Sequence, residues 1–182
     1  MTPNAQLTHL GLYVKDMDHM VAFYTSLLGL VVTDRGEFLG RQLTFLSRRA
    51  DEHHQIVMVS GRNCPEGVQL LSQISFRVDD LDALRHFHDR AGDLGARALE
   101  GRNHGNSWSV YFEDPEDNRL EIYTTTPWYV RQPWRVTLDL SMTNDQIAEE
   151  TWTLIQHETE WSPIEDWRAR LAGRLNHSSG LS

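Results

Sequence analysis

The sequence predicts an α+β fold, in which two tandem β-α-β-β-β modules form a cupped mixed sheet and a helical C-terminal extension follows. Two observations predict it. Without any gap, Thr8–Val14 aligns with Ser72–Val78, and both stretches read as strands. After each comes an Asp-x-Asp helix start, at Asp16 and Asp80, and short β-rich stretches follow each helix. Self-similarity of this kind indicates a repeated supersecondary unit.

The first module contains one amphipathic helix between Asp16 and Gly29. A side-chain oxygen at the N-cap accepts hydrogen bonds from free backbone N–H groups, and glycine after the last turn is a typical stop. The apolar positions between them recur at helical spacing, at Met20, Phe23, Tyr24, Leu27 and Leu28. Three β-rich stretches complete the module, at Leu30–Thr33, Gln42–Ser47 and Gln55–Ser60.

The second module repeats this order with a weaker helical pattern. Its helix begins after Asp80 and ends at Gly95, with apolar positions at Leu81, Leu84, Phe87 and Ala91. Three β-rich stretches follow, at about Arg97–Glu100, Trp108–Glu113 and Arg119–Thr125. The stretch Arg62–Gly67 contains Asn, Cys, Pro and Gly, which is typical of a linker, and it separates the two modules.

The segment after Pro127 departs from the repeat and predicts helices. Thr143–Gln146 and Ser162–Glu165 both fit the capping-box pattern, in which two side chains satisfy free backbone groups at a helix start. We therefore expect helices at about 144–157 and 163–175, the second with proline at its first helical position.

Tryptophan is concentrated in this tail. Five of the six tryptophans lie there, at Trp128, Trp134, Trp152, Trp161 and Trp167. We interpret them as residues that pin the tail to the body or to a second subunit; alternatively, Trp128 or Trp134 forms a wall of an aromatic pocket. We accordingly divide the chain into paired modules at 1–126 (about 6–61 and 70–126) and a helical extension at 127–182.

Composition excludes several functional classes. Seventeen Lys+Arg against 26 Asp+Glu give a net charge of −9, which argues against nucleic acid as a partner, because phosphate binding needs clustered cationic charge. No apolar run is long enough to span a membrane, and the N-terminal residues lack the pattern of a secretion signal. The single Cys64 excludes an internal disulfide framework. We expect a cytoplasmic enzyme or small-molecule binder.

The repeat places four positions at equivalent points of the two modules. His9 aligns with Gln73 on the first strands, and Val57 aligns with Glu121 on the last strands. Since Glu121 lies between two apolar residues of a strand, it faces the opposite side of the sheet from both. Two modules packed about a pseudo-twofold axis would bring all four positions together.

These features resemble the vicinal oxygen chelate superfamily, which includes glyoxalases, fosfomycin and bleomycin resistance proteins, and type I extradiol dioxygenases. The first module carries the resemblance in THLGLYVKDMD and FYTSLLGL, and the second in SQISFRVDDLD and VYFEDPEDNRLEIY. It covers residues 6 to about 126. In the most specific motif, Asp114-Pro115 with Asn118 makes a tight turn before the strand that carries Glu121.

The resemblance implies a divalent metal with His9 and Glu121 as its first two ligands. Gln73 stands where the family usually has a histidine; an amide oxygen can ligate a hard cation, and some glyoxalases of this superfamily use Gln. Glyoxalase I sites generally carry a second Glu where this chain has Val57, which cannot coordinate. Three ligands at His9, Gln73 and Glu121 leave open positions that suit Fe(II) or Mn(II) and two substrate oxygens, as in dioxygenases or fosfomycin resistance proteins.

Similarity to the extradiol dioxygenases implies three catalytic residues. His54 would take a proton from a catechol, a role that suits an imidazole. Tyr111 precedes Glu121 at the spacing of an active-site tyrosine, and His104 matches a second pocket histidine. Structural roles remain open for each: His54 as a strand-start residue, Tyr111 as a core residue, His104 as a loop cap. Gln73 could likewise be a simple hydrogen-bonding residue.

The leading hypothesis is a metal-dependent extradiol-type ring-cleaving dioxygenase. We expect Fe(II), or alternatively Mn(II), with a small catecholic aromatic substrate and O2. Two other classes stay open. One is a metal-dependent lyase or isomerase of the glyoxalase type. The other is a metal-free small-molecule binding or resistance protein, which is favoured by Gln73 in place of the usual histidine ligand. Because each module leaves a sheet edge, we also expect a homodimer formed through edges or the tail.

Overall fold

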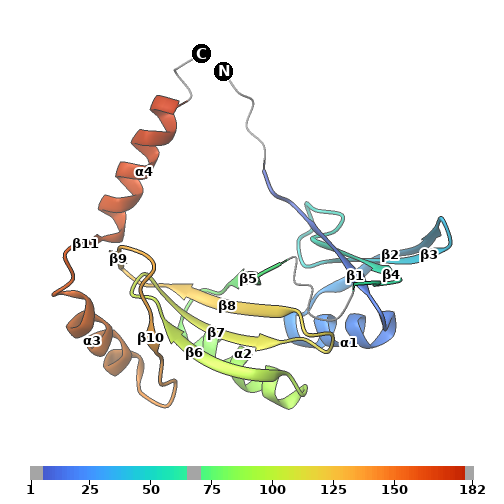
Figure 1. Cartoon of the computed structure of the whole chain (residues 1–182), viewed down its shortest axis with the longest axis horizontal. Coiled ribbons are helices and arrows are strands. Elements are labelled where there is room, and N and C mark those ends of the chain that lie inside the picture. The colour runs from blue at the N-terminus through green and yellow to red at the C-terminus, as the bar shows by residue number, and fades with distance from the viewer. Residues whose placement is uncertain (1–5, 65–70, 179–182) are drawn as a thin grey trace.

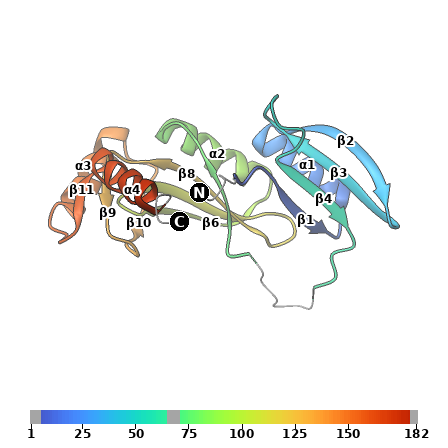
Figure 2. The same cartoon turned by 90° about the horizontal axis from the view of Figure 1, so that it is seen from above.

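The computed structural model describes residues 6–64 and 71–178. Its two larger sheets, one from each module, lie side by side, each with one helix of its own module packed against it, and a two-stranded sheet lies in the C-terminal segment. The C-terminal segment lies at the far end of the second sheet, as both views show (Figures 1 and 2). The α+β class and the paired β-α-β-β-β modules are confirmed.

The first module forms a four-stranded sheet. Its elements are β1 (Leu10–Val14), α1 (Met17–Leu28), β2 (Val31–Phe38), β3 (Arg41–Ser47) and β4 (Ile56–Ser60). The strand order is β1-β4-β3-β2, with β1 parallel to β4 and the other pairs antiparallel. As predicted, the Asp16 side chain accepts from the backbone N–H of His19, and Gly29 ends α1 in the left-handed region at φ 63°.

The strand β2 is longer than the sequence predicted. The expected stretch ended at Thr33, but pairing with β3 continues to Phe38 opposite Arg41. All eight residues of β2 are exposed. The strand therefore lacks the alternation of apolar and polar residues by which a half-buried strand is recognised in a sequence. Leu39 and Gly40 both have positive φ, which makes the tight two-residue turn that twisted hairpins favour.

The second module repeats the topology and gains one strand. Its elements are β5 (Ile74–Arg77), α2 (Leu81–Asp93), β6 (Arg97–Asn103), β7 (Ser107–Glu113) and β8 (Arg119–Thr125). The order is β10-β6-β7-β8-β5, with β5 parallel to β8. The strands β1 and β5 therefore hold equivalent edge positions, and His9 and Gln73 directly precede them. Part of the predicted linker, residues 65–67, lies outside the described residues.

The turn before β8 joins the two modules. Asp114 accepts from the backbone N–H groups of Glu116 and Asn118, as expected for this turn, and also from the buried Tyr24 hydroxyl of α1 at 3.0 Å. Glu116 Oε1 accepts from the backbone N–H groups of Lys15 and Asp16 at 2.6 and 2.8 Å. Burial, and then the charge of Asp114, raise the pKa of Tyr24 well above its ordinary value.

The tail contains β9 (Trp128–Val130), β10 (Val136–Thr137), α3 (Asn144–Ile155), β11 (Trp161–Pro163) and α4 (Ile164–Ser178). The predicted capping box forms at α3. The second predicted box differs, because Ser162 and Pro163 pair with β9 in β11, and Ser162 Oγ accepts from Arg170 instead. Figure 1 shows α4 standing away from the sheets. Among the described residues, no helix is long and apolar enough to cross a membrane.

The tail is tied to the second module by strand pairing and buried hydrogen bonds. The strand β10 pairs with the end of β6, and Thr151 of α3 accepts from Asn103 and from the Trp108 indole. Trp128 stacks on Trp152, with ring centroids 5.8 Å apart. The ring stack joins two tail tryptophans to each other, so it is the strand pairing and the Thr151 hydrogen bonds that join the extension to the second module.

Candidate functional site

Strand register gathers three predicted site residues on one face of the second sheet. Tyr111 of β7 and Ser75 of β5 are the register partners of Glu121 in β8. Since side chains alternate along a strand, Glu121 faces away from Leu120 and Ile122, which are fully buried in the core. Gln73, just before β5, reaches the same face.

The Glu121 carboxylate is 7% exposed and accepts three hydrogen bonds. Tyr111 donates its hydroxyl to Oε1 at 2.6 Å, while the Gln73 amide and the Ser75 hydroxyl donate to Oε2 at 2.7 and 2.5 Å. Three donors compensate the cost of burying the charge. Ser75 was not predicted from the sequence, although it stands two positions after Gln73 and so shares its side of the strand.

A hydrogen-bonded chain continues from Glu121 through Tyr111 to His104. His104 Nε2 lies 3.1 Å from the Tyr111 hydroxyl, and Nδ1 lies 3.2 Å from the backbone carbonyl oxygen of Trp134. A carbonyl can only accept, so His104 Nδ1 carries a hydrogen. The structure thus brings together four predicted residues: Gln73, His104, Tyr111 and Glu121.

Tyr111 remains a proton donor at neutral pH. Burial, followed by the hydrogen bond and charge of Glu121, raises the pKa of Tyr111 well above its ordinary value. The Arg119 guanidinium lies over the Tyr111 ring, 4.4 Å from its centroid, and opposes this shift. The burial and carboxylate effects prevail.

This chain opens into a pocket of about 830 Å³ between the second sheet and the tail. It is lined by Ser72, Gln73, His104, Tyr111, Arg119, Gln132, Pro133, Trp134 and Arg135. The tail therefore supplies one wall, and Trp134, one of the two tryptophans considered for the wall of an aromatic pocket, is among the lining residues. Trp128 packs on Trp152 instead. The volume suits a small organic ligand.

The other two predicted histidines pair in the first module. The rings of His9 and His54 lie 4.4 Å apart between centroids, and Phe45 packs edge-on against His54. His53 Nδ1 lies 3.0 Å from His54 Nδ1. Burial, and then the charges of His9 and His53, lower the pKa of His54, which favours the neutral imidazole.

One groove is lined by a residue from each of these two groups. His9 and Ser75 line a groove of about 710 Å³ between the modules, and Ser75 also donates to Glu121. Within the described parts of the chain, no three His, Cys, Asp or Glu side chains gather as a metal-binding group. The ligand set of His9, Gln73 and Glu121 remains a prediction. Its chemistry suits a divalent cation, because it combines an imidazole, an amide oxygen and a carboxylate.

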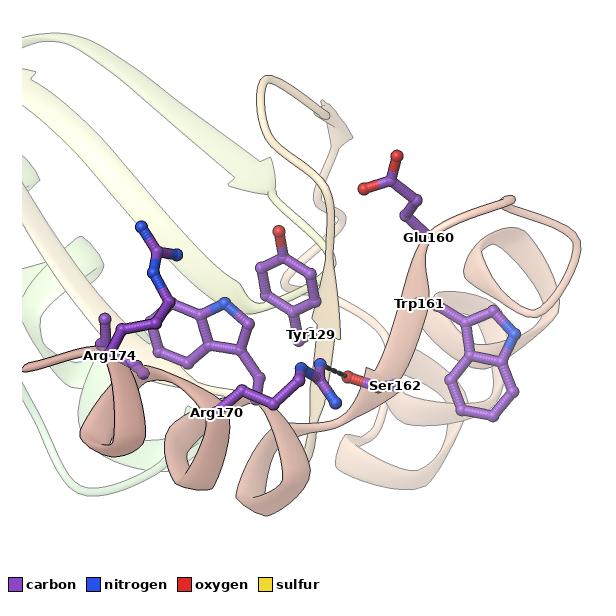
Figure 3. Close-up of a pocket in the computed structure, with 8 residues that line it drawn as sticks. Tyr129, Glu160, Trp161, Ser162, Arg170 and Arg174 are labelled. Atoms are coloured by element: carbon purple, nitrogen blue, oxygen red, sulfur yellow. Dashed lines mark hydrogen bonds between the residues drawn. The ribbon is translucent and has the colours of Figure 1, made fainter. Parts of the chain in front are cut away.

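A further hollow of about 460 Å³ lies within the tail. Figure 3 shows Tyr129, Trp161 and Arg170 around it, with Arg170 donating to Ser162. The ring of Tyr129 stacks on Trp167 at 5.3 Å between centroids. None of the six predicted site residues lines this hollow, so the pocket beside His104 and Tyr111 is the candidate site.

Comparison with known proteins places these modules in one family. The model of the Glyoxalase/Bleomycin resistance protein/Dioxygenase superfamily matches residues 6–122. No curated protein matches the chain. Among solved structures, a glyoxylase/bleomycin resistance protein/dioxygenase domain from Frankia sp. EAN1pec is similar at a TM-score of 0.59 and 22% identity, covering 68% of this chain and 100% of that one.

Two fosfomycin resistance proteins, both FosX, are also similar in fold. The protein from Mesorhizobium loti has a TM-score of 0.53 at 19% identity, covering 69% of this chain and 94% of its own. The protein from Listeria monocytogenes, complexed with Mn(II) and sulfate, has a TM-score of 0.54 at 18% identity, covering 69% and 95%. At such identities the likeness shows the fold alone.

Proposed function

Because the chain belongs to the glyoxalase/bleomycin resistance protein/dioxygenase superfamily, we propose that it is a metal-dependent extradiol-type dioxygenase that cleaves the ring of a catecholic substrate. The observation that carries this proposal is the chain of His104, Tyr111 and Glu121 beside a pocket with an indole wall. A proton donor and acceptor next to a flat aromatic wall suit a hydroxylated ring.

The residues of the chain supply orientation and proton transfer. Trp134 and Pro133 offer flat surfaces against which an aromatic ring can pack. The Tyr111 hydroxyl, held between Glu121 and His104, can donate to an oxygen in the pocket while His104 replaces the proton. His54 is assigned the role of general base for a catechol hydroxyl.

A divalent cation, Fe(II) or Mn(II), would be held by His9, Gln73 and Glu121, and would supply a Lewis-acidic centre for two adjacent substrate oxygens and, as Fe(II), the redox chemistry for O2. To ligate the cation, Gln73 would turn its amide oxygen toward it and give up the present hydrogen bond from Nε2 to Glu121. The remaining ligand is the imidazole of His9, which belongs to the first module and has to reach the other two ligands.

We propose that a second copy of the chain can meet this requirement. His9 and Gln73 directly precede β1 and β5, which lie at the edges of their sheets. Two copies related by a twofold axis, with β1 of one beside β5 of the other, would place His9 of one copy near Glu121 of the other. Tyr13 of β1 lies on the same face as His9 by strand alternation, and at 57% exposed it could be covered further in such a dimer.

One observation is compatible with two other functions of the same superfamily. The Glu121 carboxylate is fully hydrogen-bonded by protein donors, which would suit a metal-free binding protein. The same donors could serve a metal-dependent lyase or isomerase, because proton transfer to and from an enediolate needs a similar acid–base pair.

Metal content and oxygen uptake separate the three functions. We would purify the protein anaerobically, load Fe(II) or Mn(II), and measure bound metal and oxygen consumption with catechols, using Glu121→Ala as the control. Stoichiometric metal that is lost in the variant, together with oxygen uptake and ring cleavage, supports the dioxygenase. Bound metal without oxygen uptake points to the lyase class, and absence of metal under every loading condition overturns the proposal in favour of a binding protein.

A further inference from the structure

Two arginines line the same pocket as His104 and Tyr111. Arg119 comes from the start of β8, and Arg135 comes from the tail segment between β9 and β10. The Arg119 guanidinium covers the Tyr111 ring and donates to Glu100 at 2.7 Å. The Arg135 guanidinium makes no hydrogen bond or ion pair with any other described residue, and it is exposed.

The pocket has the opposite charge to the chain as a whole. The protein carries a net charge of −9, yet none of the described residues that line this pocket has a carboxylate. Glu100 is shared between Arg119 and Arg102, at 2.7 and 2.5 Å, so one carboxylate serves two guanidinium groups. Glu121 lies behind the lining residues, where three neutral donors stabilise its charge without cancelling it, and Glu158 accepts from the Trp134 indole. Among the charged side chains that line the pocket, Arg135 is therefore the one without a carboxylate partner among the described residues.

We propose that Arg135, assisted by Arg119, forms a subsite for an anionic substituent of the substrate, and that the substrate is a catechol bearing a carboxylate. A guanidinium presents two parallel N–H donors that match a carboxylate. Trp134 neighbours Arg135 in the sequence, and both line the pocket, so one ligand there can contact the indole and this guanidinium together. This inference rests on the proposed function and names its substrate class.

The test measures binding rather than turnover. Isothermal titration of the metal-free full-length protein would compare 3,4-dihydroxybenzoate with its neutral counterpart 3,4-dihydroxybenzamide, and inorganic phosphate would serve as a third probe. We expect the benzoate to bind at least about 10-fold more tightly than the amide, since a charge-assisted hydrogen bond is stronger than a neutral one. This preference should shrink as salt is added, because Arg135 is exposed.

The variant Arg135→Gln should abolish the preference for the benzoate over the amide. Arg131→Gln is the matched control, because Arg131 lies on the same tail segment but pairs with Glu160 and does not line the pocket. Equal binding of benzoate and amide, failure of both to bind, or a preference that survives in Arg135→Gln would each overturn the subsite. Tighter binding of phosphate than of the benzoate would overturn the carboxylate assignment.

The outcomes of this test are separate from those of the proposed function. A preference that depends on Arg135, without any oxygen uptake on metal loading, would keep the subsite and discard the dioxygenase. Oxygen uptake with unsubstituted catechol, and no preference for the benzoate, would keep the dioxygenase and discard the subsite.

Discussion

The hydroxyl of Tyr111 lies between Glu121 and His104, 2.6 Å from the carboxylate and 3.1 Å from the imidazole Nε2. A tyrosine hydroxyl has one hydrogen, so it can donate to only one of these neighbours at a time. In the present arrangement it donates to Glu121, and its oxygen faces His104 Nε2. The three residues therefore form one hydrogen-bonded chain beside the pocket, with Tyr111 at its centre.

Removal of the Tyr111 hydroxyl should break this chain without unfolding the protein. In Tyr111→Phe, Glu121 keeps its two other donors, so the free energy of unfolding should fall by only about 1–2 kcal/mol. The turnover rate should fall about 100-fold, because proton transfer through the chain is lost. Steady-state kinetics and urea unfolding would measure both. Tyr123→Phe is the control, since Tyr123 lies on β8 two positions after Glu121 and therefore on the same face of the strand; an equal loss of turnover there would contradict the assigned role.

Gly105→Ala should displace the tail from His104. Gly105 has φ +74°, and an added Cβ would meet Val130, Ile155 and Trp134, the last two at 3.2 and 3.3 Å. The left-handed backbone and the overpacking together should cost about 2–5 kcal/mol. Thermal or urea unfolding would measure the loss, and Trp134 fluorescence should change as its carbonyl leaves His104.

Gly36→Ala offers a matched control for this substitution. Gly36 lies in the exposed strand β2, and a Cβ there meets nothing within 4 Å. Its stability should change by less than about 0.5 kcal/mol. If both variants lose similar stability, the contact between the tail and the His104–Gly105 turn does not account for the loss in Gly105→Ala.

Much of this fold could be predicted from the sequence, because the repeat and the helical spacing are local signals. The site was less predictable. Tyr111, Glu121 and Gln73 came from a motif and lie together, but Ser75 carries no motif of its own. The carbonyl of Trp134 belongs to a tail outside the family match, so its contact with His104 depends on long-range packing. The length of the polar strand β2 was underestimated, because an exposed edge strand needs no apolar pattern.

The raised pKa of Tyr24 should be visible in the pH dependence of the free energy of unfolding. Its pKa is raised in the folded state, first by burial and then by Asp114. The raised pKa contributes stability that is fully present below the unfolded value of about 10 and is lost as pH rises through the folded pKa. Relative to Tyr24→Phe, wild-type stability should therefore fall above pH 10 by about 1.4 kcal/mol per pH unit. Urea unfolding at pH 8 and pH 11 would measure this difference; parallel curves for the two proteins would contradict it.

The substitution Gln73→His should strengthen metal binding. An imidazole is a better ligand than a neutral amide for Fe(II) or Mn(II), and Glu121 would keep its bonds to Tyr111 and Ser75. We expect Mn(II) to bind at least about 10-fold more tightly, measured by titration calorimetry. Gln42→His on β3 is the control, because Gln42 is exposed and lines none of the three pockets described above.

Mixing two inactive variants would then test whether two copies share the site. His9→Ala and Glu121→Ala should each lose metal binding when alone. If His9 of one copy serves Glu121 of the other, a dimer formed from one chain of each variant contains one intact site and one site lacking both residues. Unfolding and refolding the mixture should therefore restore about a quarter of the wild-type metal content, since half of the dimers are mixed and each has one of two sites. If each chain builds its own site, no metal returns, and the proposal of a shared site is wrong.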